Sequence, residues 1–97
     1  MDTAMMKMIR RLVVLWDLED DETNELLSIV QSNEQLQVEL LQIHASLGIL
    51  FPQQPLRYQW VSLRNTELNG SRALDVMLHE DAGIERIALM LKTKSMR

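Results

Sequence analysis

The stretch SNEQLQVELLQIHASLGILF, residues 32–51, has the clearest helical periodicity of this chain. One apolar stripe recurs every three or four residues and consists of Leu36, Leu40, Ile43, Leu47 and Leu50. A second stripe consists of Val38, Leu41, Ala45 and Ile49. A helix with two apolar stripes has to be covered on two sides, so we expect a long central helix over about 33–51. Ser32 or Asn33 can cap its start, and Pro52 ends it because proline has no N–H for the next hydrogen bond.

Helical patterns also precede and follow this segment. A first helix ending near Asp17 is predicted, and a second begins at a cap formed by Asp20 or Asp21. After the central helix, we expect a short helix in QQPLRYQWVSL, another from Ser71 to Leu78, and a last one capped by Glu80 or Asp81. No alternating strand pattern is present. We therefore predict an all-α bundle of about six helices, in which the N-terminal helices of 1–31 and the segment 32–97 form one compact domain.

Composition excludes several classes of protein. The chain has 97 residues, of which 46% are hydrophobic and 25% charged, as in one small globular domain. Cysteine is absent, which excludes disulfides and cysteine-based zinc sites. The formal net charge of -4 disfavours non-specific attraction to nucleic acid or to an anionic membrane. No apolar run approaches the roughly 20 residues that cross a bilayer, and LVVLW is too short for a signal sequence, so we expect a cytoplasmic protein.

Catalytic and metal sites are not expected. Ser71, Asp75 and His79 have the residue types of a hydrolase triad, but on one helix Asp75 would lie between the other two. His44 and His79 have no second histidine or any cysteine nearby, so no metal site is predicted. The three glycines are scattered and form no phosphate-binding loop. We therefore expect no enzyme activity and no cofactor.

The second half of the chain contains an ordered series of residues that suggests a family. The series runs from LGILFP through Trp60, Asn65, Leu68 and Gly70 to ALDVM at 73–77 and the isoleucine-rich last helix. Over roughly residues 36 to 91, this order and spacing resembles the toxin-binding domain of Xre/MbcA/ParS-type antitoxins. The family usually has a proline just after the Gly-x position, where this chain has Arg72-Ala73. The resemblance implies a small helical protein, often dimeric, that inhibits an NAD-directed toxin by covering the entrance to its nucleotide pocket.

A partner-binding face is expected where the polar 64–72 loop lies near the C-terminal tail, with Trp60 as a rigid floor behind it. The expected partner-binding residues are Arg64, Asn65, Leu68, Asn69, Gly70, Arg72, Lys92, Lys94 and Arg97. A purely structural alternative exists for two positions of the series, since Gly70 suits a turn and Trp60 suits a core.

The N-terminal helix has more apolar residues than one stripe requires, so we expect a second subunit of a homodimer to cover the surplus. The expected dimer-interface residues are Met5, Met8, Ile9, Leu12 and Trp16.

A DNA-binding role is not carried over from the family, many of whose members have a helix-turn-helix ahead of the toxin-binding domain. No lysine or arginine appears between Arg11 and Arg57, and a recognition helix without cations cannot neutralise phosphates. Two alternatives to a toxin-neutralising antitoxin stay open. One is a dimeric DNA-binding regulator of its own operon that uses Lys7, Arg10 and Arg11, and the other is a helical adaptor without a toxin.

Overall fold

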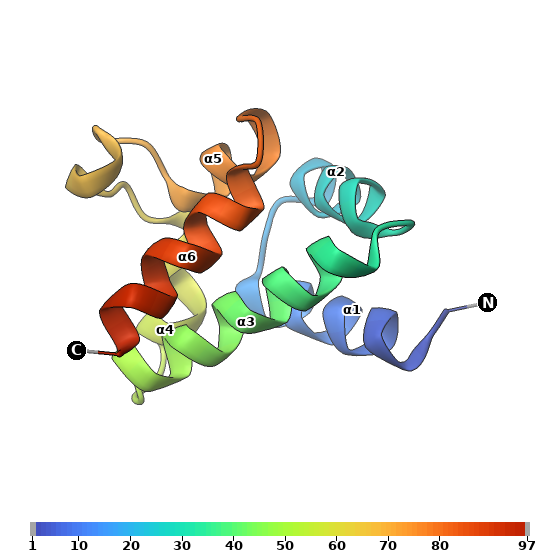
Figure 1. The fold of residues 1–97 in the computed structure, drawn as a ribbon, viewed down its shortest axis with the longest axis horizontal. Coiled ribbons are helices and arrows are strands. Elements are labelled where there is room, and N and C mark those ends of the chain that lie inside the picture. Colours follow the sequence, from blue (N-terminus) through green and yellow to red (C-terminus); the bar gives the residue numbers. More distant parts are fainter. Residues whose placement is uncertain (1, 97) are drawn as a thin grey trace.

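Six α-helices make up the fold in the computed structural model, which describes residues 2–96 and has no strand among them (Figure 1). The helices are α1 (Ala4–Trp16), α2 (Asp20–Val30), α3 (Glu34–Leu50), α4 (Leu56–Gln59), α5 (Ala73–His79) and α6 (Gly83–Ser95). Two 3-10 turns, η1 (Trp60–Ser62) and η2 (Thr66–Leu68), lie between α4 and α5. The prediction of an all-α bundle of about six helices is confirmed. The radius of gyration is 12.5 Å, as expected for one small domain.

The longest helix is α3, which packs against both α6 and α1 and so forms the centre of the bundle (Figure 1). Asn33 caps it, since its side chain accepts a hydrogen bond from the Leu36 N–H at 3.1 Å. Leu40, Ile43 and Leu47 of the first stripe are fully buried. The prediction that the second stripe is also covered is wrong for Val38 and Ile49, which are 41% and 65% exposed. The neighbouring helices cover the first stripe and its flanks only.

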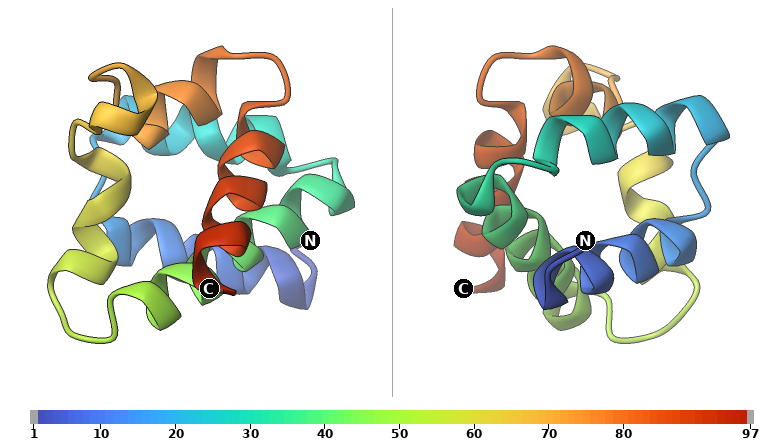
Figure 2. Two further views of the ribbon diagram at one scale, coloured as in Figure 1. Left: turned by 60° about the vertical axis from the view of Figure 1, so that its left-hand side comes forward. Right: turned by 90° about the vertical axis from the view of Figure 1, so that its right-hand side faces the viewer.

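The two N-terminal helices belong to the same core as the rest of the chain. Figure 2 shows α1 and α2 on different sides of the molecule, joined by a segment without helical structure. Each buries apolar side chains in the common core, which on these two helices are Met6, Ile9, Leu12, Val13, Trp16, Leu26 and Val30. The dimer-interface prediction is therefore wrong for Ile9, Leu12 and Trp16. Their stripe is covered by α3 and α4 of the same chain, whereas Met5 is partly buried and Met8 is half-exposed.

A close approach of α5 and α6 is possible because α6 begins with Gly83. A Cβ atom on this residue would lie 1.8 Å from the carbonyl oxygen of Val76 in α5. Ala82, immediately before it, adopts a left-handed conformation with φ 53°. The prediction that Glu80 or Asp81 caps this helix is wrong, because the chain makes its turn into α6 at Ala82 and Gly83.

In α2 and α5, a carboxylate at the third helical position accepts a hydrogen bond from the N–H of the N-cap residue. In α2, Glu22 accepts this bond from the Glu19 N–H at 3.3 Å, so the N-cap residue is Glu19 and not the predicted Asp20 or Asp21. Asp75 accepts one from the Arg72 N–H at 3.3 Å, so Arg72 and not Ser71 is the residue that caps α5.

Within residues 2–96, no helix is both long enough and apolar enough to cross a membrane.

Candidate partner-binding surface

The segment 64–72, between η1 and α5, is a loop closed by its own backbone. Arg64 and Arg72 pair as a single antiparallel bridge at its base. The Asn65 N–H donates to the carbonyl oxygen of Ser71 at 3.0 Å, and the Gly70 N–H donates to the carbonyl oxygen of Asn65, also at 3.0 Å. Because its two ends are hydrogen-bonded to each other, the loop is held in one shape.

Asparagine and glycine occupy the positions of this loop that need unusual backbone angles. Asn69 and Gly70 both adopt left-handed conformations, with φ 57° and 84°. These residue types reach that region at the lowest cost. A Cβ on Gly70 would meet no atom within 4 Å, so the requirement there is conformational and not steric. Asn65 has a further structural role, since its side chain accepts a hydrogen bond from the Glu67 N–H at 2.9 Å and so starts η2.

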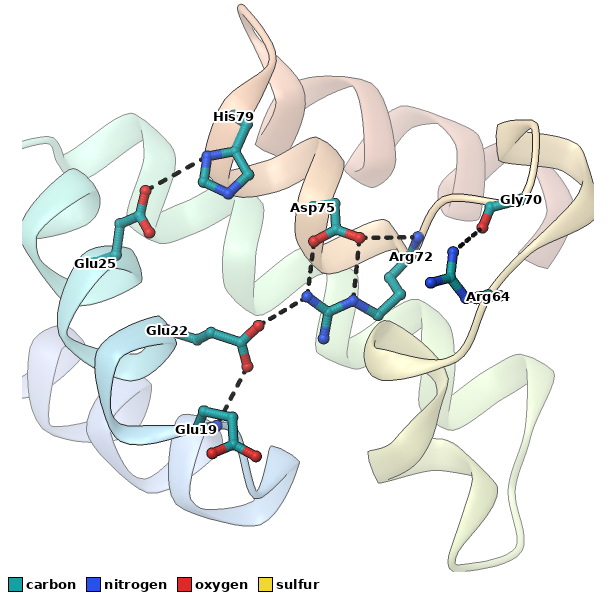
Figure 3. Close-up of polar contacts among 8 residues, drawn as sticks. All are labelled: Glu19, Glu22, Glu25, Arg64, Gly70, Arg72, Asp75 and His79. Atoms are coloured by element: carbon teal, nitrogen blue, oxygen red, sulfur yellow. Dashed lines mark hydrogen bonds and ion pairs between the residues drawn. The ribbon is translucent and has the colours of Figure 1, made fainter.

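Two residues expected to bind a partner differ sharply in exposure. Leu68 is 4% exposed and belongs to the core, so it anchors the loop and the prediction that it contacts a partner is wrong. Arg64 is exposed, and its Nη1 donates to the carbonyl oxygen of Gly70 at 3.1 Å (Figure 3). This contact holds the guanidinium close to the turn of the loop.

Arg72 has a structural role that its sequence position does not reveal. Figure 3 shows its guanidinium between two carboxylates from different helices. Its Nε and Nη2 donate to Asp75 at 3.1 and 2.7 Å, and Nη2 also donates to Glu22 of α2 at 2.8 Å. The Asp75 contact, followed by the Glu22 contact, raises the pKa of Arg72, and Arg72 in turn holds the pKa of Asp75 below its ordinary value. Arg72 thus joins α5 to α2, a structural role that the sequence did not predict.

These contacts are incompatible with a catalytic triad of Ser71, Asp75 and His79. Both oxygens of Asp75 are bonded to Arg72, and His79 lies with its Nδ1 3.6 Å from Glu25 Oε2 (Figure 3). No histidine therefore bridges Ser71 and Asp75 in the way that nucleophilic catalysis requires. Among residues 2–96, no group of three or more His, Asp or Glu side chains is placed to hold a metal ion.

A groove of about 340 Å³ lies between the 64–72 loop, the end of α3 and the last turns of α6. Its lining residues are Leu50, Phe51, Trp60, Asn65, Glu67, Leu91 and Lys94. Trp60 is only partly buried, so it lines the groove in addition to packing against the core. The groove thus combines aliphatic and aromatic side chains with three polar ones, which is the usual composition of a small binding site.

An ion pair links the loop to α6 beside this groove. Lys94 Nζ donates to Glu67 Oε1 at 2.6 Å, and the two side chains are 32% and 54% exposed. The structure thereby brings Asn65 and Lys94 together as the sequence predicts. Lys92 is exposed and does not line the groove, and Arg97 lies outside the described residues.

Sequence reasoning missed Glu67 and the groove-lining residues at the end of α3. Glu67 pairs with a lysine 27 positions later, and no local pattern marks a contact at that separation. Leu50 was predicted as part of a core stripe and of the series that carries the resemblance, but not as a partner-binding residue, although it is half-buried and lines the groove.

Helices α2 and α3 are joined by a short turn, as in a helix-turn-helix, but α3 lacks the basic residues of a DNA-recognition helix. Only three residues separate Val30 from Glu34. The exposed residues of α3 include Gln35, Val38, Gln42 and Ile49, and α3 contains no lysine or arginine. This helix therefore offers no cation to a phosphate backbone.

Comparison of the chain with protein-family models, with curated proteins and with solved structures finds no match.

Proposed function

We propose that this chain is an antitoxin-like protein that neutralises a partner toxin by protein–protein contact, and that the groove between the 64–72 loop and α6 receives the toxin. The groove is the observation that carries the proposal. It joins a loop of fixed shape to apolar side chains of α3 and α6 at one surface position. A preformed site of this kind lowers the entropic cost of binding.

The chemistry of the groove favours a partner segment with an apolar side chain beside a charged one. An apolar side chain would pack against Trp60 and Leu50, which line the groove and are only partly buried. The charged side chain of the partner would replace one member of the Lys94–Glu67 ion pair. An ion pair this exposed contributes at most about 1 kcal/mol, so a partner can open it at small cost.

The residues that carry the family resemblance support the same place. Trp60 and Asn65 line the groove, while Leu68 and Gly70 hold the loop in its shape. The resemblance further suggests that the toxin acts on NAD, and the reading frame next to the gene of this chain is the natural source of the toxin to test.

The test is growth rescue on co-expression with that toxin. Lys94→Glu places two carboxylates together at the rim of the groove, and Arg64→Ala removes an exposed cation from the loop. Both variants are expected to lose rescue while keeping the helical circular dichroism of the wild type. A chain cut after Leu91 is expected to lose rescue as well, since it lacks Lys94.

Arg10→Ala is the matched control, because it also breaks an exposed ion pair, with Asp2, but on α1. It is expected to rescue growth as well as the wild type. If all three groove variants remain folded and still rescue growth, the proposed surface is wrong.

A further inference from the structure

A small pocket lies between α1 and α3, and it shares no lining residue with the candidate groove. Its volume is about 220 Å³, and its lining residues are Met8, Arg11, Leu12, Leu15, Leu41 and His44. The lining residues from α1 follow one another at helical spacing, so they lie on one face of that helix. An apolar lining with a few polar side chains is the usual composition of a small-ligand site.

Helix α4 holds the imidazole of His44 in place. The ring of Tyr58 stacks on it, with the ring centroids 6.3 Å apart and an angle of 17° between the planes. The guanidinium of Arg57 lies 5.0 Å from the centroid of the same Tyr58 ring, and the Cδ atom of Arg57 lies beside Gly48 of α3. Burial, followed by the charge of Arg57, lowers the pKa of His44. The imidazole is therefore neutral at pH 7 and has one N–H to donate.

The polar groups at this pocket lack partners within the part of the chain that the structure describes, residues 2–96. Neither Arg11 nor Arg57 forms an ion pair there. The Nε atom of Arg57 and the Nδ1 atom of His44 are buried and make no hydrogen bond. A proton on Nδ1 would be a buried donor without an acceptor, so the neutral imidazole carries its proton on Nε2. Buried polar groups are paired in most proteins, so these groups are matched to a ligand that brings negative charge and accepts hydrogen bonds.

We infer that the pocket between α1 and α3 binds a small monocarboxylate with an apolar body, and that its carboxylate contacts Arg11 and His44. The guanidinium of Arg11 can donate two parallel hydrogen bonds to the two carboxylate oxygens, and the Nε2–H of His44 can donate a third. The apolar body then packs on the methionine and leucine side chains of the lining. The volume is below the roughly 300–1,000 Å³ of pockets for drug-sized molecules, which favours a small ligand such as a medium-chain fatty acid.

The charge of the lining favours this ligand over other small molecules. A cation would meet Arg11 without a counter-charge, since no acidic side chain lines the pocket. A phosphate monoester would bring about 1.5 to 2 negative charges against a single lining cation. A nonpolar molecule would leave both Arg11 and His44 unpaired. A monocarboxylate matches the one cation and the one neutral donor.

Calorimetric titration of the full chain at pH 7 with sodium octanoate, below the concentration at which it forms micelles, tests this inference. Octanoate is expected to bind saturably, with one molecule per chain. Butyrate should bind at least about tenfold more weakly, because it has four fewer methylene groups to bury. The neutral alcohol 1-octanol should also bind about tenfold more weakly, because it lacks the charge that pairs with Arg11. Absence of saturable octanoate binding, or equal binding of octanoate and 1-octanol, would overturn the inference.

Two substitutions locate the carboxylate. Arg11→Gln removes the cation from an exposed position and should weaken octanoate binding about tenfold without changing that of 1-octanol. His44→Phe keeps a ring to stack on Tyr58 but removes the N–H, so it should weaken octanoate binding by a smaller factor. Arg10→Gln is the matched control, because Arg10 is exposed on the same helix but does not line this pocket. Octanoate affinities that are equal for Arg11→Gln and Arg10→Gln, in chains with the circular dichroism of the wild type, would contradict the proposed site.

Discussion

Replacement of Gly83 by alanine is the most informative test of the packing that positions the candidate surface. The new Cβ would lie 1.8 Å from the carbonyl oxygen of Val76, 2.7 Å from its carbonyl carbon and 3.1 Å from the Cα atom of Met77. All three atoms belong to the backbone of α5, so no side chain can rotate away to make room. The two helices would have to separate by more than about 1 Å to restore ordinary van der Waals distances.

The expected loss is large for so small a change. Overpacking a core costs about 1–3 kcal/mol, and a backbone obstacle places this case near about 3 kcal/mol. Gly48→Ala is the matched control, because Gly48 lies inside α3 and its added Cβ would come no closer than 3.9 Å to the Arg57 side chain. There the higher helix propensity of alanine should stabilise the chain by about 1 kcal/mol. The same substitution is thus expected to have opposite effects at two positions.

Urea unfolding followed by circular dichroism measures both effects. With a denaturant dependence of about 1 kcal/mol per M, Gly83→Ala should lower the midpoint by about 3 M, and Gly48→Ala should raise it by about 1 M. A Gly83→Ala variant as stable as the wild type would refute the close approach of α5 and α6. So would a Gly48→Ala variant that loses as much stability as Gly83→Ala.

Three further predictions concern the N-terminal half and its contact with α5. Arg72→Ala should lower the free energy of unfolding by about 1–2 kcal/mol at neutral pH, because it breaks charged hydrogen bonds between α2 and α5. Arg72 holds the pKa of Asp75 below its ordinary value of 3.8, so the stability that their contact provides is present above pH 3.8 and is lost as the pH falls through the lower folded pKa. Over that acid range, Arg72→Ala should therefore lose less stability than the wild type. Melting temperatures measured at a series of acid pH values would show this difference. Ile9→Ala should lower the free energy of unfolding by about 2–5 kcal/mol, whereas Val14→Ala should change that of the monomer by no more than about 0.5 kcal/mol, as thermal unfolding would show. Equal effects of the two substitutions would contradict the burial of α1 in the core. The chain should not bind duplex DNA tightly, because α3 has no cation, and a low-salt titration with sub-micromolar, sequence-selective binding would contradict this.

Much of the fold follows from local periodicity, because helices are stabilised by contacts between near neighbours and by one buried stripe. The stripe of Leu40, Ile43 and Leu47 predicts the central helix and its buried side correctly. Periodicity does not tell which neighbour covers an apolar residue. It could not show that Ile9, Leu12 and Trp16 are buried by their own chain and not by a second subunit.

The candidate surface was harder to predict, because its polar residues make contacts across long separations. Arg72 suggests a free cation in a loop, yet it is held by Glu22, 50 positions earlier in the chain. Lys94 meets Glu67 through the packing of α6 and not through any local pattern. The turn role of Gly70, by contrast, could be predicted, because its left-handed conformation depends only on the local backbone.

The most direct measurement of the central claim is an NMR titration of the isotope-labelled chain with the proposed partner toxin. Binding at the groove predicts that amide resonances of 60–72 and of the last two turns of α6 shift most, together with the indole N–H of Trp60. Resonances of α2 should change little. Saturating binding that shifts α2 or the start of α3, and leaves 60–72 and the end of α6 unchanged, would contradict the account.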